Sequence, residues 1–588
     1  MRLKTAAAFL LLGLIALVAG IGQLTWWAPE KYVTAVVPAD TKAAPLTVID
    51  GGLAQLRGDD ATLTVRGEGN FVLAAARPDE VEAWVGKAAH NTIDGASEDG
   101  RTLTVTHADG EPSAPNPAGA DLFASTQSAS GTLEYRWDFP AEGEWQLVLA
   151  SDGKAAAPQD VTITWPSQAS APWAIPLVVI GGILLLAAVV LAVLGTGRGR
   201  GGTRGPGRGG PTTGSDQGRR SGPAPRGGRA AGAGRASGWS PNSDRGGFTP
   251  RRAAPSRPSS QRWGARAAAG AVVLVLAGPV ALPAAQATGS PSEQAAAPQR
   301  ILLEEQLQRI LEQTANAVQT GDNAKDAAKL APRVAGTALL ARTKNYKVRT
   351  EVAKAPALAP VRATDLLSSV VTTTRTWPRT VVAVTQGEGN TTPQLLTLRQ
   401  ATPRENYKLI EAVPLLPGNT FPSTASAGAE TLALDAKEGL AATPAEAIAG
   451  VADRLSSAKS KWKDRIPGNA YITDTHGYQA DIVKSSPNAK FTFKHSLVGK
   501  EATAFRTADG GALVFAPLDF LITGTPKEAG DKVTLQADAA VLAGGNEATG
   551  KMTLTFRETV AVYISPEGGD GKVTLIGATR NLSAASVG

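Results

Sequence analysis

The sequence predicts a multidomain membrane protein in which an exported all-β sandwich domain and an exported α+β domain are joined by transmembrane helices and a disordered Arg/Gly linker. Three observations predict this arrangement. Uncharged apolar runs of membrane-spanning length lie at residues 174–194 and 267–285. The stretch between them, residues 196–266, holds 15 Arg and 19 Gly but only two acidic residues. The remaining parts alternate apolar and polar residues with the periods of strands or helices.

Charge and composition exclude several classes of function. The linker has a net charge of +13 and the whole chain only +7, so the other residues are acidic overall. This partition argues against a basic nucleic-acid-binding fold. The chain has no Cys, which excludes disulfides, thiolate catalysis and Cys metal sites. Its exported parts therefore depend on hydrophobic cores for their stability.

Residues 1–27 predict a signal anchor that forms the first transmembrane helix. Arg2 and Lys4 precede an apolar run, and Trp26 and Trp27 follow it. The cations favour a cytoplasmic N-terminus, and the two Trp suit the far membrane interface. A cleavable signal peptide is the alternative. We favour the uncleaved anchor because no clean Ala-x-Ala cleavage site follows the run.

Residues 28–172 predict an extracytoplasmic β-sandwich domain. Short segments in which apolar and polar residues alternate are separated by Gly, Asp and Pro, as in an antiparallel sandwich. Residues 79–87 are expected to form a short helical insert. Trp137, Trp145 and Trp165 lie within the alternating pattern, so we expect them to pack in the core rather than to form a carbohydrate-stacking platform.

Residues 173–195 predict the second transmembrane helix and fix the predicted topology. The 21 uncharged residues 174–194 span roughly 31 Å at about 1.5 Å per residue, which is enough for the hydrocarbon layer. Trp173 marks the outer interface, and the Arg-rich residues 196–266 follow the run directly. The positive-inside rule therefore assigns residues 196–266 to the cytoplasm and residues 28–172 to the outside.

The linker at residues 196–266 lacks the aliphatic residues from which a core is built, so we expect it to be disordered. Its Arg residues, interspersed with Trp239, Phe248 and Trp263, have two possible partners. One is single-stranded nucleic acid, and the other is the anionic headgroups of lipids. We favour the lipid headgroups and expect no nucleic acid partner, because the segment is tethered to a membrane at both ends.

Residues 267–287 predict either a third transmembrane helix or an internal signal peptide. Arg262 and Arg266 precede an apolar run, and the run leads to a small-x-small site at residues 285–287. These are the three parts of a secretory signal peptide, located in mid-chain. We favour the uncleaved span, and cleavage after Ala287 is the alternative. Both alternatives export residues 288–588.

Residues 288–430 and 431–588 predict two α+β domains in tandem. Residues 300–319 carry apolar residues on one helical face, a short helix is expected at residues 324–330, and residues 337–349 look strand-like before further strands. The order recurs after Thr443, where Thr443, Pro444 and Glu446 predict a helix start with a capping box. A helix packed on a curved antiparallel sheet is the expected outcome in each half.

Two resemblances follow from this pattern and from short motifs. Helix, short helix and a long bent sheet resemble the NTF2-like (cystatin-like) cone. The runs WPRT at residues 377–380, PRENYKL at 403–409 and LLPG at 415–418 are similar to an uncharacterised family of actinobacterial membrane-anchored exported proteins. That resemblance implies no particular activity. NTF2-like folds include enzymes, binding cones and dimerisation modules, so the fold does not decide the function.

Few residues are available for catalysis or for metal binding. The chain has four His, and none belongs to an H-E-x-x-H motif. Asp474 and His476 could meet His495 as a metal or acid/base cluster, but we expect an ordinary turn at residues 473–478. His90 and His107 are expected to be solvated. Asp519 interrupts an apolar strand; an edge or outward position is favoured over a buried catalytic carboxyl.

These observations lead to three hypotheses on function, and we expect neither catalytic residues nor a cofactor or metal. The first is a non-enzymatic, membrane-anchored cell-envelope protein that presents extracytoplasmic domains for binding or assembly with an unknown envelope protein or ligand. The alternative is a carrier of an apolar ligand, such as a lipid or isoprenoid, in an NTF2-like cone. A hydrolase or isomerase is less well supported. A carrier requires an apolar cavity, whereas an interaction module would be packed solid.

Overall fold

The computed structural model describes residues 2–57, 60–139, 143–152, 154–167, 170–196 and 299–588. The predicted linker and the apolar run at residues 267–287 lie outside the described residues. Two described helices are long and apolar enough to span a membrane, α1 (Arg2–Leu24) and α3 (Ala174–Thr196). Their apolar spans each contain 21 residues, Lys4–Leu24 and Ala174–Leu194, and most of their large apolar side chains are exposed.

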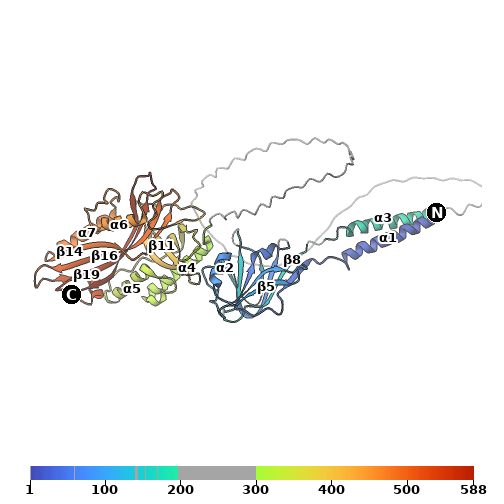
Figure 1. The fold of residues 1–588 in the computed structure, drawn as a ribbon, viewed down its shortest axis with the longest axis horizontal. Helices are drawn as coiled ribbons and strands as arrows, with labels where there is room; N and C mark the ends of the chain where they lie inside the picture. The colour runs from blue at the N-terminus through green and yellow to red at the C-terminus, as the bar shows by residue number, and fades with distance from the viewer. Residues whose placement is uncertain (1, 58–59, 140–142, 153, 168–169, 197–298) are drawn as a thin grey trace, which may run out of the picture. The chain divides into compact units, whose positions relative to one another are not determined.

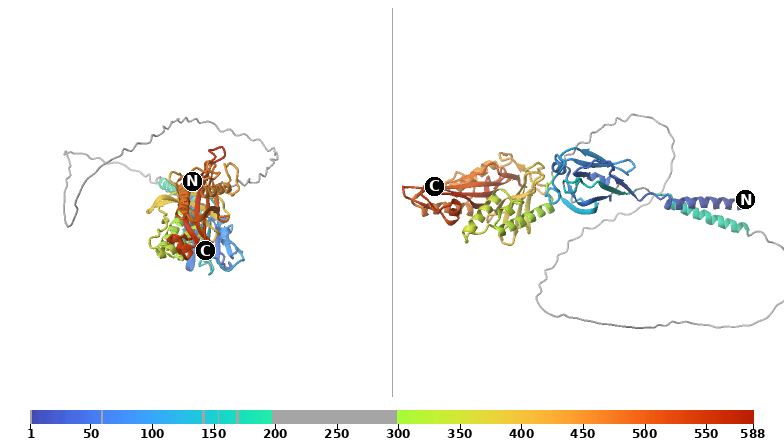
Figure 2. Two further views of the ribbon diagram at one scale, coloured as in Figure 1. Left: turned by 90° about the vertical axis from the view of Figure 1, so that its left-hand side faces the viewer. Right: turned by 90° about the horizontal axis from the view of Figure 1, so that it is seen from below.

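Helices α1 and α3 lie side by side in both Figure 1 and Figure 2. Glycines allow the two backbones to approach closely. A Cβ atom on Gly13 would lie 3.0 Å from the carbonyl oxygen of Gly181, and one on Gly181 would lie 2.7 Å from the backbone nitrogen of Leu17. Small residues at a helix contact are a common basis of association between helices in membranes.

The β-rich part of the chain, here called the β lobe, comprises residues 32–166. Its eight strands are β1 (Tyr32–Val36), β2 (Leu46–Asp50), β3 (Thr62–Ala76), β4 (His90–Ala96), β5 (Leu103–Ala108), β6 (Ser125–Arg136), β7 (Gln146–Ala150) and β8 (Asp160–Pro166). They form one sheet in the order β1-β8-β3-β7-β2-β4-β5, and β6 also pairs with β3. A short 3-10 helix, η1 (Gly51–Gln55), follows β2. The predicted antiparallel pattern is wrong at one pair, because β2 and β4 run parallel.

Strand β3 explains how one sheet encloses a core. Its first part pairs with β8 and its second part with β7, and the register against β6 shifts between Gly67 and Asn70. Such bulges bend a strand and increase its twist. The sheet thus folds over a core to which both strand groups contribute, including Leu63, Leu73 and Ile163.

The outer face of β2, β3 and β7 is covered by the predicted helical insert, α2 (Pro78–Val85). Val81 and Trp84 of α2 are buried against this face. The prediction for the other tryptophans is confirmed for two of them: Trp165 and Trp145 are buried in the core, and Trp165 donates a hydrogen bond from Nε1 to the Leu53 carbonyl at 2.7 Å. Trp137 follows β6 and packs against the same core.

The C-terminal region, residues 299–588, runs twice through two α-helices followed by antiparallel strands. The first half contains α4 (Glu304–Ala324), η2 (Ala327–Lys329), α5 (Gly336–Glu351), β9 (Asp365–Val371), β10 (Arg379–Gly387), β11 (Asn390–Gln400) and β12 (Lys408–Pro414). The second half contains β13 (Thr431–Leu432), α6 (Pro444–Ser456), α7 (Ala470–Ser485), β14 (Ala489–Leu497), β15 (Thr503–Arg506), β16 (Ala512–Pro526), β17 (Val533–Thr534), α8 (Ala537–Ala543), β18 (Glu547–Ala548), β19 (Met552–Ile564) and β20 (Val573–Ser586).

The two halves share a topology. Strands β9 to β12 form a meander in the order β12-β11-β10-β9, and β14, β16, β19 and β20 pair consecutively in the second sheet. The first sheet packs on the second through a shared core that includes Leu395, Val413 and Phe515. Helices α4 and α5 cover the free face of the first sheet, and α6 with the start of α7 covers that of the second. The result is a four-layer α/β/β/α arrangement, and Figure 1 shows the two helix layers on opposite sides.

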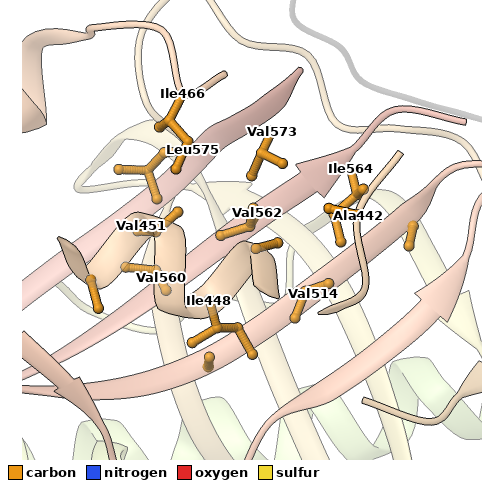
Figure 3. Packing of buried hydrophobic residues seen from close by; sticks show 14 of the residues in the cluster. Ala442, Ile448, Val451, Ile466, Val514, Val560, Val562, Ile564, Val573 and Leu575 are labelled. Carbon is orange, nitrogen blue, oxygen red and sulfur yellow. The ribbon is translucent and has the colours of Figure 1, made fainter. Parts of the chain in front are cut away.

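The core beneath α6 is closely filled. Ile448 and Val451 of the helix meet Val514, Val560 and Val562 of the sheet, and all five are at most 1% exposed (Figure 3). The helix begins as predicted: Thr443 Oγ1 accepts a hydrogen bond from Glu446 N at 3.1 Å, and Glu446 Oε2 accepts one from Thr443 N at 3.0 Å. The capping box at this helix start is therefore confirmed.

Two local predictions are wrong. Residues 337–349, expected to be strand-like, lie within α5, where Ala338, Ala341 and Tyr346 are buried on one helical face. Residues 473–478, expected to be a turn, lie within α7, which begins after Asn469, whose side chain accepts a hydrogen bond from Ile472 N at 3.0 Å. Residues 337–349 include eight Ala, Leu, Lys and Arg residues, which favour a helix, so the strand prediction overlooked the local preference. In α7, tertiary packing outweighs a weak local helix preference. The expected short helix at residues 324–330 is reduced to η2.

Ion pairs join the β lobe to the first half of the C-terminal region. Arg379 Nη1 lies 2.8 Å from Glu80 Oε1, and Arg375 Nη1 lies 2.6 Å from Asp79 Oδ1. Arg333 pairs with Asp121, and both are buried. Further hydrogen bonds run from Arg404 to the carbonyls of Trp84 and Val85 and from Arg309 to those of Phe123 and Ala124. In each of these ion pairs the carboxylate belongs to the β lobe and the cation to the C-terminal region.

Candidate functional site

An apolar cavity of about 350 Å³ lies in the second half of the C-terminal region, between the end of α7, the β17–α8 segment and strands β14, β19 and β20. We call it the apolar cavity. Its volume is within the range of ligand pockets, about 300–1,000 Å³. Most of the wall is aliphatic or aromatic. The lining residues are Tyr478, Ile482, Ser485, Ser486, Phe491, Val533, Thr534, Leu535, Gln536, Asp538, Ala539, Met552, Leu554, Phe556, Arg580 and Leu582.

Local sequence explains why the cavity forms at this position. Strands β19 and β20 extend past the part of the sheet that α6 covers, and their apolar residues there alternate onto one face, as with Leu554 and Phe556. A short cover, β17, α8 and β18, packs over this end, with Leu535 and Ala539 buried against Phe520 and Met552. Helix α8 has only 7 residues, so it covers a smaller area than α6 does.

Arg580 is the only cation in the cavity wall. Its Nε donates to Glu558 Oε1 at 2.6 Å, and its Nη2 donates to Thr475 Oγ1 at 2.6 Å. The guanidinium carbon also lies 5.0 Å from the Phe520 ring and 5.8 Å from the Tyr478 ring, which are cation–π distances.

Behind Arg580 lies a buried polar network around Glu558 and His495. The Tyr471 hydroxyl donates to Glu558 Oε1 at 3.0 Å, and His495 Nε2 lies 3.3 Å from Glu558 Oε2. The side chains of His495 and Glu558 are both fully buried. The His495 ring stacks on Phe520 with centroids 4.1 Å apart, and its Nδ1 is 3.1 Å from Ser456 Oγ.

The electrostatics of this network favour a charged Glu558. Burial alone would raise the pKa of Glu558, but the hydrogen bond and charge of His495 and the charge of Arg580 outweigh it and lower the pKa. Burial, together with the charge of Glu558, raises the pKa of Tyr471 well above its ordinary value. Glu558 is therefore an ionised acceptor of hydrogen bonds from Tyr471 and Arg580, with His495 as a third neighbour, and Tyr471 stays a neutral donor.

The side chain of His495 lies between those of Ser456 and Glu558, as in the nucleophile–base–acid series of a catalytic triad. The hydrogen bonds, however, do not support nucleophilic catalysis. The Ser456 hydroxyl donates to the Ala452 carbonyl at 2.7 Å and accepts the His495 backbone N–H at 2.8 Å. Its proton is thus directed away from His495, whereas a nucleophilic hydroxyl hydrogen-bonds to its base. His495 is also inaccessible to solvent.

The other residues considered from the sequence are spread over the fold. Asp474 is exposed on α7, and His476 Nε2 lies 2.9 Å from the Arg454 carbonyl oxygen; burial lowers the His476 pKa. Asp519 is one-third exposed and accepts a hydrogen bond from Arg557 Nε at 2.8 Å, so it is not a buried acid. Within the described ranges, no group of three or more His, Asp or Glu side chains could hold a metal ion.

His90 and His107 lie on adjacent strands of the β lobe, far along the chain from the cavity. His90 Nδ1 is 2.9 Å from the Ala88 carbonyl oxygen, and His107 Nδ1 is 2.7 Å from Asn91 Oδ1. Both side chains are thus engaged locally, and His107 is mostly shielded from solvent rather than solvated as expected.

The sequence analysis did not identify Tyr471, Glu558 or Arg580. Glu558 and Arg580 are direct partners across the β19–β20 ladder, so a hairpin register assigned from the sequence would have brought them together. The register contains two shifts, after Thr555 and after Ala561, which a regular alternating pattern does not predict. Tyr471 lies on α7, two residues before the segment 473–478 that was expected to form a turn.

Comparison with known proteins adds a family match for the C-terminal region. Residues 298–587 match the family described as a domain of unknown function (DUF8094). Neither the curated proteins nor the solved structures gave a match. The matched segment contains both helix-and-strand halves and the whole apolar cavity, and it excludes α1, the β lobe and α3.

Proposed function

We propose that this chain is a non-enzymatic, membrane-anchored extracytoplasmic binding protein that holds a small apolar ligand, of the lipid or isoprenoid class, in the apolar cavity. The observation that carries this proposal is the cavity itself. The neighbouring core beneath α6 is filled, whereas the apolar cavity leaves a space of 350 Å³ within a hydrophobic cluster. A domain that only assembled with other proteins would not require such a space.

The lining chemistry supports an apolar ligand that has an acceptor at one end. Ten of the 16 lining residues are aliphatic or aromatic, and the guanidinium of Arg580 supplies a charged donor group. A carboxylate, phosphate or hydroxyl oxygen could accept from this donor. Asp538, near the start of α8, disfavours a second anionic group in the same cavity.

The polar network behind Arg580 supports binding rather than catalysis. Arg580 donates hydrogen bonds to Glu558 and to Thr475, and Tyr471 donates one to Glu558. All three hydrogen bonds are 3.0 Å or shorter. His495 and Glu558 have no exposed side-chain surface with which a substrate could react. The network therefore fixes the orientation of the guanidinium, which is the role expected of residues that support a binding group.

The anchoring part of the proposal rests on the sequence and on the two apolar helices. Helices α1 and α3 would cross the bilayer, the linker at residues 196–266 would contact anionic headgroups on the cytoplasmic side, and residues 267–287 would cross again. The paired glycines of α1 and α3 favour retention of α1 as an anchor over its removal as a signal peptide. The β lobe would then support the C-terminal region at the outer surface.

Filling the cavity tests the proposal. The full chain and its Leu582→Trp variant would be purified from membranes, and the molecules that co-purify would be extracted into organic solvent and identified by mass spectrometry. We expect an apolar species that accompanies the natural chain and is lost in Leu582→Trp. Leu521→Trp is the matched control, because Leu521 is 36% exposed and lies outside the cavity. Identical extracts from all three chains would contradict the proposal.

A further inference from the structure

A second cavity, of about 210 Å³, lies where the two halves of the C-terminal region meet, and it differs from the apolar cavity in chemistry. We call it the polar cavity. Helix α5 and the β10–β11 turn supply one side, and β12, β19 and β20 supply the other. Nine of its lining residues carry amide, hydroxyl or guanidinium groups: Thr337, Arg342, Asn390, Thr391, Thr392, Gln394, Thr559, Thr579 and Asn581. Neither of the functions discussed above uses this space.

Four side chains in this wall have a buried polar atom with no hydrogen-bond partner in the part of the chain that the structure describes. Asn390, Gln394 and Thr559 are respectively 9%, 5% and 0% exposed. The unpaired atoms among the described residues are both amide atoms of Asn390, Oε1 of Gln394, Oγ1 of Thr559 and Nε of Arg342. Buried polar groups are nearly always hydrogen-bonded, and leaving them unpaired is costly. A molecule within the cavity, either water or a ligand, is the available source of these partners.

The charge of the wall indicates a neutral molecule. No carboxylate lines the cavity, and the charge of its one cation, Arg342, is balanced by Asp322, whose Oδ1 lies 3.6 Å from Nε. Nη2 of Arg342 donates to the Ala359 carbonyl at 3.0 Å, and Nε has no hydrogen-bond partner among the described residues. An anion would find no free charge here, and a cation would find no counter-charge.

The mixture of donors and acceptors indicates hydroxyl groups on the ligand. Asn390 offers a donor and an acceptor, Gln394 offers an acceptor, and the Thr559 hydroxyl is either. Hydroxyls match such a wall because each one can donate and accept. No aromatic side chain lines the cavity, so it lacks a surface on which a planar base would stack. At about 30 Å³ per water molecule the volume equals roughly seven waters, which is the size of a monosaccharide or cyclitol.

We infer that the polar cavity binds a neutral polyhydroxylated small molecule, a monosaccharide or cyclitol. The unpaired atoms come from the first half, at Asn390 and Gln394, and from the second half, at Thr559. A bound polyol would thus bridge the two halves. This site is independent of the apolar cavity, so either assignment can fail without the other.

Direct binding to the full chain tests the inference. The probes are myo-inositol, D-glucose, D-mannose and L-arabinose, measured by isothermal titration calorimetry and by saturation-transfer NMR. Thermal stabilisation is not used as the readout, because polyols stabilise proteins generally by exclusion from their surfaces. We expect at least one probe to bind with a stoichiometry of one per chain. If none of the four binds, the inference is overturned, and the polar cavity holds solvent only.

Matched variants connect binding to this cavity. Asn390→Leu and Thr559→Val should weaken binding at least tenfold, because each removes unpaired polar atoms to which the ligand would supply hydrogen bonds. Thr314→Val is the control: Thr314 is fully buried and its hydroxyl is also unpaired, but it lies on α4 away from the cavity. This variant should bind as the natural chain does. If Thr559→Val, confirmed as folded by its melting curve, binds with unchanged affinity, the site is elsewhere and the assignment is wrong.

Discussion

Arg379 of the C-terminal region and Glu80 of the β lobe form a buried ion pair across 299 residues of sequence, with Nη1 and Oε1 2.8 Å apart and side chains 1% and 6% exposed. The Arg379 guanidinium also lies 3.9 Å from the Trp377 ring and donates to the Arg375 carbonyl. Burial raises the pKa of Glu80, and the charge of Arg379 counteracts that shift. A buried charge of this kind depends on its partner, since removing one member leaves the other uncompensated.

Charge reversal at this pair should separate the two parts of the chain. We expect Glu80→Arg to weaken their association by about 3–5 kcal/mol, the usual cost of breaking a buried pair. The double variant Glu80→Arg with Arg379→Glu should recover much of this loss. Association would be measured in the full chain carrying a protease site in the linker, as the fraction of fragments that stay together after cleavage. Glu82→Arg, an exposed change on the same helix, should have no effect.

A second prediction concerns pH and Glu411, which is buried on β12. Burial raises the pKa of Glu411 to about 8, although Arg399 counteracts the shift. The folded state therefore holds a proton that the unfolded state has lost, at every pH between the ordinary value for Glu and about 8. In this window stability should fall as pH rises, by about 1.4 kcal/mol per pH unit.

Glu411→Gln should remove this dependence. Its free energy of unfolding, measured by denaturant titration, should equal that of the natural chain near pH 4 and exceed it at pH 8. Glu388→Gln, an exposed change on the β10–β11 turn, is the control and should leave the pH profile as it is. Parallel profiles for Glu411→Gln and the natural chain would mean that Glu411 is ionised when folded.

The contact between α1 and α3 should depend on Gly181. A Leu there would place side-chain atoms against the backbone of Leu17, which lies 2.7 Å from the Cβ position, so the helices should splay. Because the chain has no Cys, spin labels on cysteines introduced at Lys4 and Leu194 would report their separation in lipid nanodiscs. Gly182→Leu is an adjacent control, since nothing lies within 4 Å of its Cβ position. Equal distance distributions in both variants would refute close helix packing.

The capping box of α6 offers a smaller and local effect. Thr443→Ala removes the acceptor for Glu446 N and should destabilise the fold by about 1 kcal/mol. Thr443→Ser keeps the acceptor and should stay close to the natural chain. Denaturant midpoints of the three chains provide the comparison, and a loss in Thr443→Ser as large as that in Thr443→Ala would indicate lost packing of the methyl group instead.

Features encoded by neighbouring residues were predictable from the sequence. Thr443, Pro444 and Glu446 specify a helix start within four residues, and both α1 and α3 follow from uninterrupted apolar runs. The alternating pattern predicted β3, β5, β6, β7 and β8 of the β lobe but not β1, β2 or β4, and the helix expected at residues 79–87 is found at Pro78–Val85. Each of these depends on interactions within one turn or one strand, so the local pattern is sufficient.

Features that depend on distant contacts were not predictable. Helix α7 contains Thr473, Thr475 and Gly477, which are weak helix formers, and it is held by tertiary contacts such as that of Tyr471 with Glu558. The cation–carboxylate arrangement at Arg580 depends on the register of two strands with two shifts. The two cavities lie between elements far apart in the sequence. The periodicity of apolar residues predicts which side chains are buried, but it does not predict where the packed side chains leave a space.

The pairing of Arg379 with Glu80 also has a consequence for membrane insertion. Two surfaces that bury each other's charges have to fold in the same compartment, because neither carboxylate nor guanidinium can reach its partner through a bilayer. In the proposed topology α1 and α3 bring the chain to the cytoplasm at the end of α3, so the chain has to return before α4. A chain that failed to return would expose the unpaired charges of Glu80 and Asp121 beside Trp84 and Phe123. The Arg379–Glu80 ion pair would thus form only in a chain that is both correctly inserted and correctly folded.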